Sequence, residues 1–186
     1  MTTKRLDAWR LATGLGLAAA LAGCTPTPVA KVEPTSATPH VVAASNLEAG
    51  KYLTLVGGCN DCHSPGYNEG GGTMPEADRM TGNPVGMRGP WGVSYATNLR
   101  LLTQSINEDG WVQLLKDGKS LPPMPTNNMK HMSEGDLRAL YQYIRSLGPK
   151  GVPEPENLPP GVEPTTPTEN MMPEPPKAAA PLAKAG

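Results

Sequence analysis

The sequence lacks phenylalanine, and aromatic residues make up only 4% of its 186 residues. So few large apolar side chains argue against a conventional large core. They fit either disorder or a small domain filled by something other than side chains. An excess of positive charge is also absent, because 16 Lys and Arg face 17 Asp and Glu. This balance argues against nucleic-acid binding, which needs a basic surface. The three cysteines are too unevenly spaced for a disulfide framework.

The first 23 residues have the features of an export signal. A basic region precedes an apolar stretch of small residues at 11–22, which is too short to span a bilayer. The stretch ends in Leu-Ala-Gly-Cys24, which resembles the lipobox of bacterial lipoproteins. The resemblance implies a lipid anchor on Cys24, which would place the protein in the bacterial cell envelope, facing the periplasm. It does not decide between the inner and the outer membrane. A plain secretory signal with an incidental cysteine is the alternative.

Proline (22) and glycine (21) are abundant, and the prolines concentrate in two flanking segments. Residues 24–44 have neither helical nor strand periodicity, which predicts an extended tether behind the lipidated cysteine. Residues 150–186 are rich in proline and glutamate, which predicts a disordered tail with polyproline character. The folded domain is therefore expected over residues 45–149.

Three helices are predicted within residues 45–149. Each begins with a serine followed three residues later by an acidic residue, and apolar residues at helical spacing come next. The serine and acidic pairs are Ser45 and Glu48, Ser105 and Glu108, and Ser133 and Asp136. The glycine-rich loops between them show no strand alternation, so the expected fold is all-α. Three short helices bury too little surface to be stable alone, which predicts that a large apolar group fills the centre.

The segment Cys59-Asn-Asp-Cys62-His63 has the C-x-x-C-H pattern of covalent c-type haem attachment. Two residues between the cysteines let both sulfurs reach the vinyl groups of one porphyrin, and His63 can then ligate the iron. A redox dithiol would need a βαβ context, and zinc would need further paired Cys or His. Neither pattern is present. We therefore expect one covalent haem c, held by Cys59 and Cys62, with His63 as axial ligand.

Met124 is the expected second axial ligand. It lies in Leu-Pro-Pro-Met-Pro, where the prolines oppose helix and stiffen the chain. A methionine sulfur opposite histidine is a usual ligand pair in electron-carrying haem proteins. Met129 and Met132 are alternative candidates for this ligand. His131 is a further candidate, and with His63 it would give the iron two histidine ligands. Gap filling in the core is the other role open to Met124.

On these motifs, residues 45–149 resemble a single-haem class I cytochrome c domain, with a small fold of about three helices and long loops around the haem. In that family the first and last helices cross at a small and an aromatic residue, and the matching positions are Gly50 and Tyr143. The segment Gly-Pro-Trp-Gly-Val-Ser-Tyr at 89–95 is similar to cytochromes paired with periplasmic dehydrogenases. The haem-pocket residues that the resemblance implies are Pro90, Trp91, Tyr95, Asn98 and Trp111.

The implied function is that of an electron carrier and not an enzyme, because protein ligands on both axial positions leave no site for substrate. A periplasmic dehydrogenase would be the electron donor, and a terminal oxidase or another cytochrome the acceptor. The membrane is contacted through the lipid anchor. Two alternatives from other classes stay open, which are a peroxidase-like haem enzyme with a labile sixth ligand and a haem-based redox sensor module.

Overall fold

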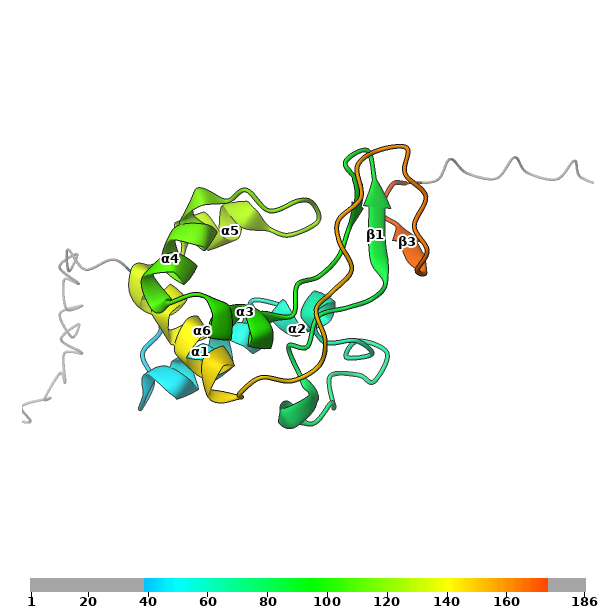
Figure 1. Ribbon diagram of the computed structural model, residues 1–186. Helices are drawn as coiled ribbons and strands as arrows, with labels where there is room; N and C mark the ends of the chain where they lie inside the picture. The colour runs from blue at the N-terminus through cyan, green and yellow to red at the C-terminus, as the bar shows by residue number, and fades with distance from the viewer. Residues whose placement is uncertain (1–38, 174–186) are drawn as a thin grey trace, which may run out of the picture. The chain divides into compact units, whose positions relative to one another are not determined.

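Six α-helices, one 3-10 helix (η1, Glu76–Asp78) and three short strands make up the regular structure of residues 39–173, the part of the chain that this computed structural model describes (Figure 1). The expected signal peptide, Cys24, most of the tether (24–38) and the end of the tail (174–186) lie outside these residues. No helix within 39–173 is long and apolar enough to cross a membrane. The helices are α1 Asn46–Val56, α2 Cys59–His63, α3 Leu99–Ser105, α4 Glu108–Asp117, α5 Thr126–His131 and α6 Glu134–Ser146; the strands are β1 Gly86–Gly89, β2 Gly92–Ser94 and β3 Thr168–Asn170.

The first and last predicted helices begin at the predicted caps. The Ser45 side chain accepts a hydrogen bond from the Glu48 amide, and Ser133 accepts one from the Asp136 amide. The Asp136 carboxylate in turn accepts from the Val41 amide at 2.8 Å. The chain before α1 therefore contacts the folded domain earlier than the predicted boundary at residue 45.

The middle predicted helix, α4, begins two residues later than the sequence suggested. Its cap is Asn107, whose side chain accepts from the Gly110 amide. The predicted cap, Ser105, is instead the last residue of a helix that was not expected, α3. The predicted end is confirmed, since Gly118 closes α4 in the left-handed conformation with φ 58°.

Helices α1 and α6 pack against each other, and Gly50 and Tyr143 meet at their crossing. A Cβ atom placed on Gly50 would lie 2.6 Å from the Tyr143 Cβ and closer still to the Ala139 carbonyl oxygen. The absence of a side chain at Gly50 is therefore what lets the two backbones approach. Leu137 and Ile144 of α6 are at most 1% exposed and form the centre of the core beside this contact.

The structure is mostly helical, and the prediction that it is all-α is wrong in one respect. Strands β1 and β2 form an antiparallel hairpin, and β3 pairs with β1 in parallel, in the order β2-β1-β3. Each strand has three or four residues. Runs this short cannot show the alternation of apolar and polar residues by which strands are recognised.

The predicted disorder of the tail is wrong for residues 150–173, which we call the C-terminal strap. Figure 1 shows the strap running from the end of α6 to the sheet, where it supplies β3. Leu158 also forms an isolated antiparallel bridge with Val93. The prolines do exclude helix, but they permit an extended chain whose hydrogen-bond partners come from distant residues.

Candidate functional site

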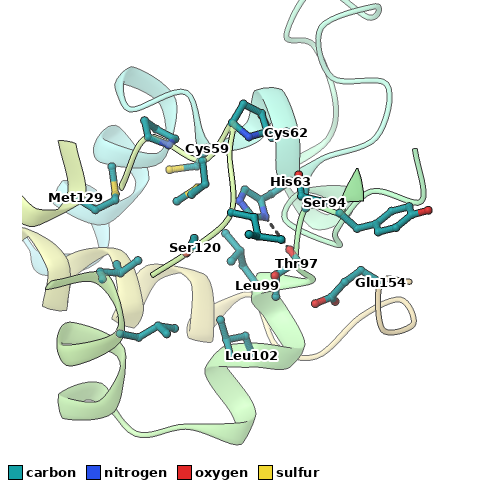
Figure 2. Close-up of a pocket in the computed structure, with 18 of the residues that line it drawn as sticks. Cys59, Cys62, His63, Ser94, Thr97, Leu99, Leu102, Ser120, Met129 and Glu154 are labelled. Atoms are coloured by element: carbon teal, nitrogen blue, oxygen red, sulfur yellow. Dashed lines mark hydrogen bonds between the residues drawn. The ribbon is translucent and has the colours of Figure 1, made fainter. Parts of the chain in front are cut away.

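A cavity of about 460 Å³ opens between α2, the helices α3 to α6 and the strap. This volume falls within the roughly 300–1,000 Å³ of small-molecule and cofactor sites. Its wall contains both cysteines and the histidine of the C-x-x-C-H segment, which Figure 2 shows side by side. Apolar side chains make up much of the remaining wall, namely Leu99, Leu102, Leu114, Leu115, Leu140 and Ile144.

The C-x-x-C-H segment forms the short helix α2 immediately after α1. Gly57 ends α1, and Gly58 turns the chain in the left-handed conformation with φ 66°. Because Cys59 and Cys62 are three residues apart on α2, both thiols lie on one side of the helix. His63 follows on the same helix, and neither cysteine takes part in a disulfide. The two thiols and the imidazole thus reach one cavity.

The pKa of each thiol lies above its ordinary value. Burial, with a smaller contribution from the charge of Asp61, raises the pKa of Cys59 to about 11. Burial also raises the pKa of Cys62. A redox dithiol works through a thiolate whose pKa is lowered, so these values disfavour that alternative. Residues 39–173 contain no group of three or more His, Cys, Asp or Glu that could hold a metal ion.

His63 is buried, and the backbone sets the orientation of its ring. Its Nδ1 lies 2.7 Å from the Thr97 carbonyl oxygen, so Nδ1 donates the hydrogen bond. Burial lowers the pKa of His63, against the opposing effects of this hydrogen bond and of the Glu154 charge. A neutral ring protonated at Nδ1 leaves the lone pair of Nε2 available to ligate a metal.

Two of the candidate methionines, Met124 and Met129, line the cavity. Met124 is partly buried and Met129 is 7% exposed. Met132 lines a smaller neighbouring cavity, and His131 is exposed. Of the four candidates for a second axial ligand, the structure therefore brings two to the cavity that contains His63.

Five further residues were expected in the pocket, and two of them, Tyr95 and Trp111, line the cavity. Trp111 is 3% exposed, and its indole nitrogen donates to the Leu137 carbonyl at 2.9 Å. This bond holds α4 on α6, so that the indole ring is fixed where the two helices border the cavity.

The other three, Pro90, Trp91 and Asn98, do not line this cavity. Pro90 and Trp91 form the turn between β1 and β2, with the Trp91 ring packed against Gly89. Asn98 is the N-cap of α3 and is 1% exposed. Local backbone structure occupies these side chains, so they do not face the cavity.

Two lining residues of the strap, Glu154 and Asn157, were missed by the sequence analysis. They lie in a segment whose composition predicts disorder. The residues that they contact, Tyr95 and Asn98, come more than fifty positions earlier in the chain. No local pattern of the sequence marks such a contact.

Comparisons with known proteins connect the chain to one component of a dehydrogenase. No family model matches it, and no solved structure matches it. The chain is similar to a nicotinate dehydrogenase subunit of Pseudomonas putida, with 27% identity over 125 residues that cover 62% of this chain. The match spans only 10% of the length of that relative, so the similarity concerns a small part of a much longer protein.

Proposed function

We propose that this protein is a c-type cytochrome that relays single electrons. The observation that carries the proposal is the apolar cavity in which the Cys59 and Cys62 thiols, His63 and a methionine come together. This set fits a covalently attached haem, which would supply reversible one-electron oxidation and reduction at its iron. Residues of the cavity wall, Trp111 among them, would exclude water from that group.

Each residue of the C-x-x-C-H segment has a separate part in the proposal. Cys59 and Cys62 would hold the haem through thioether bonds, and the raised pKa of each thiol would limit its oxidation before attachment. His63 would ligate the iron through Nε2. The hydrogen bond from its Nδ1 to the Thr97 carbonyl keeps the ring in one tautomer and one orientation.

We assign the second axial position to Met124. Its amide donates to the Leu121 carbonyl, and its own carbonyl accepts from the Thr126 amide, so the backbone that carries the sulfur is held. Met129 is buried on α5 and also borders the smaller cavity beside Leu140, which fits a packing role. With protein ligands on both positions, no coordination site is left for a substrate. This arrangement favours electron relay over peroxidase-like catalysis.

Met124→Ala is expected to abolish the weak sulfur-to-iron charge-transfer band of the oxidised protein and to lower the reduction potential, because the thioether ligand is lost. It is also expected to open the iron to carbon monoxide. Absorption spectroscopy and redox titration of the purified full-length protein measure these effects. Met129→Leu is the matched control and should keep the band, since leucine preserves the packing volume.

Two results would contradict the assignment. Loss of the band in Met129→Leu, with the band kept in Met124→Ala, would transfer the ligand role to Met129. A parent protein that lacks the band and binds carbon monoxide readily would favour the haem enzyme with a labile sixth ligand over the electron carrier.

We further propose that the protein is anchored by lipid on Cys24 and faces the periplasm, with a dehydrogenase as electron donor and a terminal oxidase or another cytochrome as acceptor. The lipobox-like end of the apolar stretch supports the anchor. The similarity to a component of a dehydrogenase supports the class of donor.

Cys24→Ser is expected to move the protein from the membrane fraction to the soluble periplasmic fraction. The reason is that acyl chains, and not an apolar helix, provide the attachment. Immunoblotting of fractionated cells measures the shift, and haem staining of the same samples should be unchanged. A variant that stays with the membrane would show that the anchor is not on Cys24.

A further inference from the structure

The C-terminal strap forms part of the wall of the cavity. Its residues Glu154 and Asn157 line the cavity, and Figure 2 shows Glu154 beside Thr97, next to His63. The strap follows the chain segment that leads into α3. Leu158 and Val93 exchange two backbone hydrogen bonds of 2.9 Å at the start of that segment.

Strap side chains hold the backbone on both sides of Thr97. The Tyr95 amide donates to the Asn157 side-chain oxygen at 2.8 Å. The Asn98 amide donates to a Glu154 carboxylate oxygen at 2.9 Å. Thr97 lies between these two anchored amides, and its carbonyl accepts the hydrogen bond from the proposed iron ligand. The strap therefore positions the group that orients that ligand.

The side chain of Asn98 also binds the strap. Its side-chain nitrogen donates to the Lys150 and Val152 carbonyls at 2.9 and 3.0 Å. Its side-chain oxygen accepts from the Leu101 amide and caps α3. A buried amide group with these partners is costly to unpair, because each group left without a hydrogen bond would have lost its contact with water as well. Lys150 and Val152 at the start of the strap are thus bound to the same segment, residues 95–98, as the cavity-lining residues Glu154 and Asn157.

The strap also brings negative charge to the side of the cavity that holds the C-x-x-C-H helix. The Glu154 carboxylate lines the cavity and is held there by the Asn98 amide, one residue after the Thr97 carbonyl that binds His63. A carboxylate close to a haem iron stabilises the oxidised form, which carries one more positive charge than the reduced form. The Glu154 carboxylate is therefore placed to lower a reduction potential.

We propose that the C-terminal strap is a redox-tuning element of this protein. In this proposal Glu154 and Asn157 act as positioning residues that hold Thr97, and through it the His63 ring, while the Glu154 carboxylate lowers the reduction potential. The inference rests on the proposed function, because it needs a haem bound in the cavity.

The charge part of the inference is tested by Glu154→Gln in the full-length, haem-loaded protein. Glutamine can still accept from the Asn98 amide, so the substitution removes charge and keeps the contact. The ratio of reduced to oxidised protein at a fixed ambient potential is expected to rise about threefold. Glu163→Gln is the matched control, since Glu163 pairs with Arg88 at 2.6 Å on the exposed side of the strap and does not line the cavity. It should leave the ratio unchanged.

The positioning part is tested by Asn157→Ala, with Asn170→Ala as the control from the same strap. Loss of the Asn157 acceptor is expected to speed hydrogen exchange of the Tyr95 amide at least tenfold and to shift the electron paramagnetic resonance g values of the oxidised iron. Asn170 accepts from the Met172 amide and does not line the cavity, so its variant should change neither.

Three outcomes decide between the proposals. Equal effects of Glu154→Gln and Glu163→Gln on the ratio would overturn the tuning role, and unchanged g values in Asn157→Ala would overturn the positioning role. In both cases haem retained on a denaturing gel of the same sample leaves the cytochrome proposal standing. A parent protein without covalent haem would overturn the cytochrome proposal, and the inference with it.

Discussion

Replacing both Cys59 and Cys62 by alanine is expected to abolish haem attachment and, with it, the folded state of the domain. The cavity between α2, α4 and the strap would then have no covalently held occupant. The apolar side chains that the haem would cover would then face water, and a small domain has only about 5–15 kcal/mol of stability to lose.

Haem staining after denaturing electrophoresis and far-ultraviolet circular dichroism measure the two effects. The parent protein should keep its haem through denaturation, because thioether bonds survive unfolding. Cys24→Ser is the control, since it removes the remaining cysteine and should retain both haem and helix signal. Haem that is extracted from the parent by acid and acetone would contradict covalent attachment.

Gly50→Ala is expected to lower the free energy of unfolding by about 2 kcal/mol. The added Cβ would press on the Ala139 carbonyl and lie 2.6 Å from the Tyr143 Cβ, so α1 and α6 would have to separate. Overpacking of this kind costs about 3 kcal/mol. The gain from replacing glycine inside a helix offsets only about 1 kcal/mol of that. Urea denaturation of the haem-loaded protein measures the difference.

Gly135→Ala is the matched control for this substitution. Gly135 is an exposed residue in the first turn of α6, and a Cβ placed on it would meet no atom closer than 3.9 Å. The same change of residue should therefore leave stability equal or raise it by up to about 1 kcal/mol. Equal losses in both variants would show that the close crossing of α1 and α6 is not what requires glycine at position 50.

Features with a local physical cause were predictable from the sequence. Each of the caps at Ser45 and Ser133 needs only a serine side chain that accepts a hydrogen bond from the amide three residues later. Both caps are present. The end of α4 at Gly118 depends on the backbone freedom of one residue. Within the C-x-x-C-H segment, spacing alone predicted that two thiols and an imidazole share one site, and all three line one cavity.

Features with a distant cause were not predictable in this way. Strand β3 exists because its backbone pairs with β1, about eighty residues earlier in the chain. Asn98 was expected on the cavity wall, but its side chain fastens the strap and caps α3. Ser105 carries the signature of a cap, but α3 occupies that position. In each case the conformation or the hydrogen-bond partner depends on groups that the fold brings near from distant parts of the chain. The local sequence is compatible with more than one of these outcomes.

The sequence by itself therefore determined the starts of α1 and α6, the end of α4 and the meeting of two thiols and an imidazole at one site, because these depend on contacts within a few residues. The tertiary structure decided which methionines reach the cavity, which acceptor orients His63, and that residues 150–173 are ordered. The physical reason is that a proline-rich segment has no internal hydrogen bonds to reveal its structure. Its backbone and side chains find their partners, such as Tyr95 and Asn98, only when the rest of the chain has folded.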